Sequence, residues 1–171
     1  MAIDIFEYAK RGQVYHAANT ANATLSALST TATGFILHNP TGSGVNLALL
    51  NVSGYHNTAQ AGAGGVGIAM SPAEVVADIT HTTPLVIRSA ILTGNAGFSK
   101  ANADVSATTV GTPVFVKHLY GVNATASVVY NKVDSPINGA LILPEGVSIQ
   151  LAYVTTAVVG LWSMTWLEYK P

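Results

Sequence analysis

Strict alternation of apolar with small or polar residues is the feature that most restricts how this chain can fold. The run Val147–Tyr153 places Val, Ile, Leu and Tyr at every second position. Trp162, Met164 and Trp166 repeat this spacing near the C-terminus, with Ser163 between the first two. A period of two puts successive side chains on opposite faces of a β-strand, so each run predicts one buried face and one wet or interfacial face.

Turn residues divide the chain from Gly12 onward into short runs of this kind. Asn39–Gly44 and Pro144–Gly146 are the clearest turns, because Pro supplies a fixed φ and Gly a positive one. Residues 58–67 and 93–104 are expected to form long loops. The expected strands are Gln13–Ala17, Thr24–Leu28, Phe35–His38, Val45–Val52, Ile68–Met70, Val75–Ile79, Leu85–Leu92, Val114–Leu119, Ala126–Tyr130, Ala140–Leu143, Val147–Tyr153 and Leu161–Glu168.

Strands of this length and spacing are typical of an all-β, two-sheet antiparallel sandwich, and we favour the jelly-roll type. Ala, Gly, Ser and Thr make up 71 of the 171 residues, while the usual residues of helix surfaces are scarce. The sequence therefore predicts an N-terminal arm at residues 1–11 followed by a sandwich domain at 12–171. A β-barrel and an immunoglobulin-like sandwich stay open as alternatives.

The low charge of the chain excludes several classes of partner. Lys, Arg, Asp and Glu make up 9% of the residues and leave a net charge of -1. Nucleic-acid binding needs a basic surface, and attachment to anionic lipid needs a polybasic patch, so we expect neither partner. No window approaches the length of apolar sequence that a membrane-spanning helix requires. A weakly charged chain with 49% hydrophobic residues is instead expected to cover part of its surface with a partner or with copies of itself.

Residues 62–67 formally match the glycine pattern of dinucleotide-binding loops, G-x-G-x-x-G. That function needs a helix after the glycines and an acid about twenty residues further on. Pro72 interrupts such a helix, and Ile87 stands where the acid should be. The glycines therefore predict a flexible loop.

The titratable residues form no recognisable catalytic or metal-binding pattern. The five histidines, His16, His38, His56, His81 and His118, are scattered, whereas metal sites favour ligands clustered on one rigid element. Glu74 and Asp78 are four residues apart, which we attribute to chance rather than to a pair of hydrolytic carboxylates. The chain has no cysteine, so it holds neither disulfides nor a thiolate site. We expect no catalytic residue, no metal and no cofactor.

Aromatic residues offer a second possible chemistry, stacking against sugars. Trp162 and Trp166 could form such a platform, but their period-two spacing favours positions in the core. Tyr55, Phe98 and Tyr120 lie near predicted loops, where a carbohydrate-binding site would expose aromatic side chains.

Residues 1–11 are the most charged stretch of the chain and carry large apolar side chains as well. Ile3, Ile5, Phe6 and Tyr8 have no place in the alternating core pattern. Either the segment is a frayed terminus or these four side chains dock on a neighbouring subunit, and we favour docking because they would otherwise be exposed. The segment does not look like a signal peptide, so we expect the chain to be made in a cytosol and to work without export through a cleaved signal.

Three segments resemble parts of small structural proteins of tailed bacteriophages. Phe35–Leu47 is similar to a strand that ends in Asn-Pro, a small residue and Gly-Ser-Gly before the next strand begins. Leu141–Ile149 resembles their Leu-x-Leu-Pro-x-Gly hairpin, and Leu161–Glu168 resembles their closing strand with two tryptophans and a glutamate. Residues 54–104 match no such motif.

This resemblance implies a virion structural protein, of the kind that forms jelly-roll cement or decoration proteins on capsids. Such a protein would bind the major capsid protein of the phage head as a homotrimer and would carry out no reaction. The alternative that we keep is a tail-fibre or spike domain whose loops bind carbohydrate on the host surface.

Overall fold

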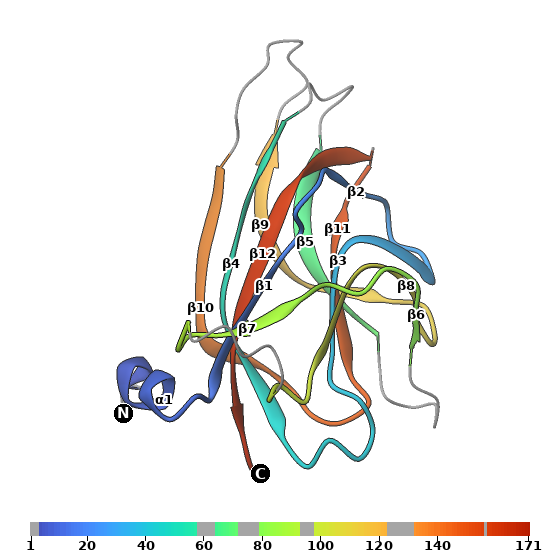
Figure 1. Cartoon of the computed structure of the whole chain (residues 1–171). Coiled ribbons are helices and arrows are strands. Elements are labelled where there is room, and N and C mark those ends of the chain that lie inside the picture. The colour runs from blue at the N-terminus through green and yellow to red at the C-terminus, as the bar shows by residue number, and fades with distance from the viewer. Residues whose placement is uncertain (1–3, 58–63, 72–78, 93–97, 123–131, 156) are drawn as a thin grey trace.

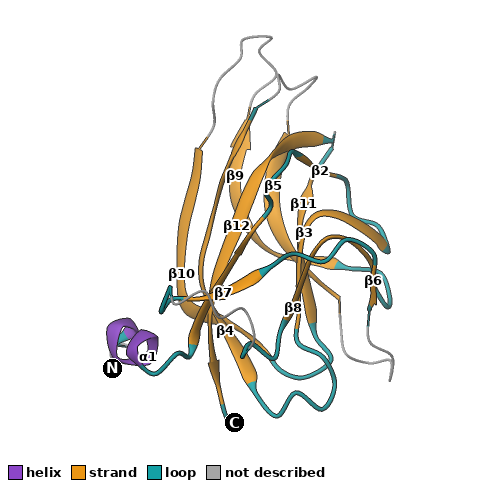
Figure 2. Ribbon diagram, in the orientation of Figure 1, coloured by secondary structure: helices purple, strands orange, loops and turns teal. Residues whose placement is uncertain are grey.

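Two antiparallel β-sheets pack face to face in the computed structural model of the chain (Figure 1). The structure describes residues 4–57, 64–71, 79–92, 98–122, 132–155 and 157–171. Within them one short helix stands beside the two sheets, and almost all other regular structure is strand (Figure 2). The predicted all-β, two-sheet sandwich is therefore confirmed.

Within the described residues, each sheet contains six strands. The first, sheet A, has the order β10-β4-β12-β1-β7, and β2 also pairs with β12. Its strands are β1 (Val14–Ala18), β2 (Ala23–Leu25), β4 (Asn46–His56), β7 (Ile87–Ser89), β10 (Lys132–Leu143) and β12 (Val158–Tyr169). The second, sheet B, has the order β6-β8-β3-β11-β5-β9. Its strands are β3 (Thr31–His38), β5 (Gly64–Ser71), β6 (Thr80–His81), β8 (Asn102–Thr108), β9 (Val114–Val122) and β11 (Ser148–Tyr153).

Eight of these strands form four nested antiparallel pairs, in which early strands pair with late ones. The early strand β1 pairs with the last strand β12, and β3 pairs with β11. Toward the middle of the chain, β4 pairs with β10 and β5 pairs with β9. Successive pairs lie alternately in sheet A and sheet B. The jelly-roll type of this sandwich stays a prediction.

The core lies between the two sheets and is built from the inward faces of the strands. Trp162 and Trp166 on β12 are almost fully buried, and the ring of Trp166 stacks against Tyr15 with centroids 6.3 Å apart. The prediction that these tryptophans belong to the core is confirmed. Other large side chains buried in the same cluster are Phe35, Leu37, Leu47, Leu49, Ile68, Leu143, Leu151 and Tyr153.

The prediction that one face of β11 is wet or interfacial is wrong, because the chain itself covers both faces. All six residues of β11 are buried, including Ser148 and Gln150 on the face that points away from the core. The strand lies between β3 and β5, and the outer face of β3 carries Ile36, which belongs to a second apolar cluster with Ala32, Ile79 and Ala107. Alternation therefore marked the difference in polarity between the two faces, but not their exposure to water.

Part of the predicted glycine loop is also wrong, because residues 64–67 belong to β5. A Cβ atom on Gly64 would lie 2.4 Å from Cε1 of Tyr153, and one on Gly67 would lie 2.8 Å from Cδ1 of Phe115. These glycines therefore leave room for aromatic rings that pack directly against the strand. The remainder of the glycine pattern, residues 62–63, lies outside the described residues.

Other strand boundaries differ from the predicted ones. The predicted loop at 93–104 overlaps β8, which begins at Asn102, and the strand predicted at Leu85–Leu92 shortens to β7. The predicted strand Ala126–Tyr130 lies outside the described residues, as does Val75–Ile79 except for its last residue. Both β4 and β10 are longer than predicted, because they pair with each other over most of their length.

The end of β12 is tied to sheet B by one buried carboxylate. Glu168 accepts hydrogen bonds from Ser99 Oγ at 2.6 Å, from the backbone N–H of Lys100 at 3.0 Å and from Trp166 Nε1 at 3.1 Å. The backbone N–H of Ala101 also donates to it at 3.3 Å. These donors compensate the cost of burying a charge, and they hold the segment before β8 against the last strand.

We expect the substitution Glu168→Gln to lower the free energy of unfolding by about 2–3 kcal/mol. The amide would turn an N–H group toward donors and leave buried groups without an acceptor. Glu145→Gln is the matched control, because Glu145 accepts two backbone N–H bonds at an exposed turn. Urea unfolding should show the larger loss for Glu168→Gln, and equal losses would contradict the role given to burial.

Candidate docking surface

Within the predicted N-terminal arm, the structure forms the helix α1 (Ile5–Lys10). Asp4 caps it, because Asp4 Oδ1 accepts hydrogen bonds from the backbone N–H groups of Phe6 at 3.2 Å and Glu7 at 3.3 Å. Lys10 Nζ lies 2.9 Å from Glu7 Oε1, one turn away. An N-cap residue followed three positions later by glutamate is a helix-start signal that our sequence analysis missed.

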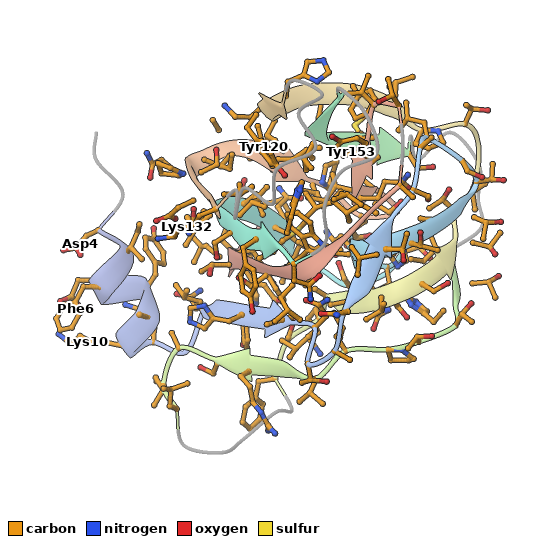
Figure 3. All side chains as sticks on the ribbon, turned by 90° about the horizontal axis from the view of Figure 1, so that it is seen from above. Asp4, Phe6, Lys10, Tyr120, Lys132 and Tyr153 are labelled. Atoms are coloured by element: carbon orange, nitrogen blue, oxygen red, sulfur yellow. The ribbon has the colours of Figure 1, made fainter. Side chains whose placement is uncertain are left out.

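The apolar side chains of α1 point in two directions. Phe6 is 68% exposed and Ile5 is 41% exposed, and Figure 3 shows Phe6 pointing away from the sandwich. Lys10 Nζ covers one face of the Phe6 ring, 5.0 Å from its centroid. Tyr8 instead packs on sheet A, and Ile3 lies outside the described residues. Docking by Ile5 and Phe6 onto a neighbour therefore stays a prediction, whereas Tyr8 attaches the helix to its own sandwich.

Tyr8 rests on a small apolar cluster at one end of the outer face of sheet A. The cluster is formed by Val14, Ala48, Leu50 and Leu167, which lie on β1, β4 and β12. Beyond this cluster the outer face continues with small polar side chains. Ser53 Oγ and Ser163 Oγ are 2.7 Å apart, and His16 Nδ1 lies 2.9 Å from Thr165 Oγ1.

A groove of about 520 Å³ runs along this outer face beside β7. Its lining includes His16, Ala18, Val86, Arg88, Leu92 and Thr165. A second hollow of about 380 Å³, lined in part by Tyr55, Leu161 and Lys132, shares Ala18 and Ser163 with the groove. The two hollows therefore form one continuous surface over β1 and β12.

Two aromatic side chains that the sequence placed near loops lie on strands. Tyr55 is part of β4 and is exposed at the second hollow, whereas Tyr120 is part of β9 and is half-buried. Phe98 lies between strands and is exposed, as expected. Trp162 and Trp166 are buried in the core, so they cannot stack against a sugar at the surface.

The structure brings two of the histidines together on the outer side of sheet B. His81 Nδ1 lies 2.5 Å from Oδ2 of the buried Asp104, and His81 Nε2 lies 3.2 Å from Asn102 Nδ2. The ring of the buried His38 lies 5.7 Å from the ring of His81. This arrangement anchors β6 to β8, because both nitrogens of His81 contact residues of β8. Among the residues that the structure describes, no group of three or more His, Asp or Glu side chains could hold a metal ion.

A third histidine, His56, lies inside the sandwich within a cluster of aromatic rings. The ring of His56 on β4 lies 5.3 Å from Tyr120, 5.4 Å from Trp162 and 6.3 Å from Tyr153. Burial disfavours the charged form of the imidazole and lowers the pKa of His56 to about 4. Burial also lowers the pKa of His16 on the outer face of sheet A.

The remaining candidates from the sequence contribute no site. Glu74 and Asp78 lie outside the described residues. His118 on β9 is exposed and lies against Phe115, with ring centroids 5.1 Å apart. The described residues also contain no helix long and apolar enough to cross a membrane.

Sequence reasoning missed the groove. Its walls come from β1, β7 and β12, which pair only in the folded chain, since Tyr15 lies opposite both Ser89 and Trp166. The exposed positions of β1 and β12 could have been read from their alternation. No local sequence pattern indicated that Val86 and Leu92 lie beside β1 and β12.

Comparisons with protein-family models, with curated proteins and with solved structures found no match for this chain.

We expect acid to destabilise the fold through His56. Its pKa is about 6.5 in the unfolded chain and about 4 in the folded one, so the unfolded state binds the proton first. Stability should be complete above pH 6.5 and should fall by about 2–3 kcal/mol as the pH drops toward 4. His16 contributes in the same direction.

Urea unfolding at pH 7 and pH 4.5 measures this dependence. The variant His56→Phe should lose less stability between the two pH values than the wild-type protein does. His118→Phe, which replaces an exposed histidine, is the control and should keep the wild-type dependence. An unchanged dependence in His56→Phe would show that another group is responsible.

Proposed function

We propose that this protein is a non-enzymatic virion structural protein of a tailed bacteriophage. Its role would be that of a capsid cement or decoration protein, which binds the major capsid protein of the head and stabilises it as a homotrimer. The proposal joins the resemblance of three sequence segments to a surface that suits protein–protein contact.

The single observation that carries the proposal is the outer face of sheet A. Small side chains such as Ala18, Ser53 and Ser163 make this face shallow, so another backbone can approach it closely. Exposed apolar side chains border it at Val86 and Leu92, and α1 projects beside it with Phe6. Interfaces that bind protein are depleted in charge at their centre and enriched in such apolar contacts.

Two of the three segments that carry the resemblance also contact each other. Asn39 Nδ2 donates hydrogen bonds to the carbonyl oxygens of Val45 at 2.8 Å and Leu143 at 3.0 Å. Glu145 accepts from the backbone N–H groups of Gly42 at 3.1 Å and Gly44 at 2.7 Å. The Asn-Pro turn and the Pro-Glu-Gly turn therefore form one structural unit. This supports the proposal that the two segments belong to one shared motif.

Removing residues 1–11 tests the proposed role of the arm. We expect the truncated protein to keep its β-sheet circular dichroism, because α1 contributes no residue to the core between the sheets. Its attachment to phage heads that lack the protein should weaken, as measured by co-sedimentation. The conservative control Lys10→Arg keeps the helix and its charge, so it should bind as the full chain does.

A cryo-EM difference map of heads with and without the protein shows where it binds. Density at capsid positions with local three-fold symmetry would support the proposal. If the full-length protein bound no head and no difference density appeared, the proposal would be wrong.

The second hollow gives the alternative function a specific basis. Tyr55 offers an exposed aromatic ring beside Lys132, an arrangement that suits stacking and hydrogen bonding to a sugar. A tail-fibre or spike domain would bind host carbohydrate there. On a glycan array the wild-type protein would then bind, and Tyr55→Ala would lose binding by about two- to tenfold, since aromatic stacking is worth about 0.5–1.5 kcal/mol.

A further inference from the structure

Helix α1 presents an apolar end with a negative border. Ile5 and Phe6 are exposed, and the two acidic residues Asp4 and Glu7 lie next to them in the first turn. Lys10 in the last turn pairs with Glu7 and covers one face of the Phe6 ring. The N-terminal part of α1 is therefore an apolar projection beside the carboxylate of Asp4, whereas the charge of Glu7 is already paired.

The groove beside β7 has the opposite character. Val86 is 59% exposed and Leu92 is 83% exposed, so two large apolar side chains border it in contact with water. Arg88 supplies a positive charge to it, whereas His16 is a polar contact that burial keeps in its neutral form by lowering its pKa, and no acidic residue is found among the described residues that line it. An apolar projection with the carboxylate of Asp4 beside it is complementary to this groove in both polarity and charge.

The helix does not fill the groove of its own chain. Tyr8 fixes α1 on the apolar cluster at Val14 and Leu167, which is separate from the lining of the groove. From this position Phe6 points away from the sandwich (Figure 3). A side chain that is held outward by its own fold is available to a second molecule.

We infer that α1 of one copy docks into the groove of a second copy, with Ile5 and Phe6 against Val86 and Leu92 and with Asp4 near Arg88. This inference rests on the proposed homotrimer and names the contact that would build it. The two surfaces differ, so the contact is heterologous, and such contacts close into a ring when the rotation between copies permits it. In a closed ring of three, every copy supplies one helix and one groove.

Site-specific cross-linking tests this contact directly. The chain has no cysteine, so a single introduced thiol is the sole target of a short bis-maleimide reagent. The variants Phe6→Cys and Leu92→Cys are purified separately and mixed. Any cross-link between the two variants must join different molecules. Val116→Cys is the control partner, because Val116 is an exposed residue on β9 of sheet B.

We expect the Phe6→Cys and Leu92→Cys mixture to give about tenfold more hetero-cross-linked product than the Phe6→Cys and Val116→Cys mixture. Docking holds the first pair of thiols at a high effective concentration, whereas the second pair meets only by diffusion. Equal yields in the two mixtures would overturn the inference.

Light scattering supplies an independent measurement that needs no cysteine. The full chain should have three times the mass of one 17.6 kDa subunit. Phe6→Asp should weaken this assembly by about 30-fold or more, since an apolar side chain is lost from the contact and a charge is placed there. Val116→Asp, on the other sheet, should leave the mass unchanged. A Phe6→Asp variant that kept the wild-type mass at all concentrations would contradict the inference.

Binding to phage heads, measured on the same samples, separates the two proposals. A protein that binds heads without the cross-link would retain the proposed function and refute the contact between α1 and the groove. A protein that forms the cross-link but binds no head would support the contact between α1 and the groove and refute the proposed function.

Discussion

The structure depends on β12, the last strand of the chain, which lies in the middle of sheet A. It pairs with β4 along one edge and with β1 and β2 along the other, and its inward side chains include both tryptophans. Because the partners of β12 come from the first third of the chain, the pairing of sheet A is complete only when the C-terminal residues are in place. Contacts of such high sequence separation are typical of slow, cooperative folding. The pairs β3 with β11, β4 with β10 and β5 with β9 likewise join early strands to late ones.

Large aromatic rings pack directly against glycine residues, which explains how a chain so rich in small residues fills its core. A Cβ atom on Gly54 would lie 2.5 Å from Cε3 of Trp162, and one on Gly160 would lie 3.0 Å from its Cζ2. The indole therefore lies between two glycines of neighbouring strands, and Tyr153 uses Gly64 in the same way. Close packing requires that volume added by an aromatic side chain is removed from its neighbours. Glycine and alanine in these strands serve that requirement, even though their intrinsic preference for strands is low.

Buried polar groups give the sandwich a fixed register at places where apolar packing alone would allow slippage. Glu168 joins the end of β12 to the segment before β8, and Asn39 joins the two turns that follow β3 and β10. Each side chain satisfies several hydrogen-bonding groups at once, so moving a strand by one residue would leave donors or acceptors unpaired. The outer face of sheet A is built in part on β12, whose end Glu168 fixes. Small side chains lose little rotamer freedom when a partner covers them, which favours the proposed docking.

The sequence by itself determined the class of the fold and the direction of its side chains, because alternation and turn residues act over a few neighbouring positions. It placed Trp162 and Trp166 inward, and it bounded β11 and the turn at Asn39 closely. Only the tertiary structure decided that residues 64–67 form a strand, since their strand geometry comes from pairing with β9 and from the ring of Tyr153. It also decided that both faces of β11 are buried, and that β1, β7 and β12 together form a groove beside α1. These features depend on which segments become neighbours, and a period of two residues contains no information about the neighbour.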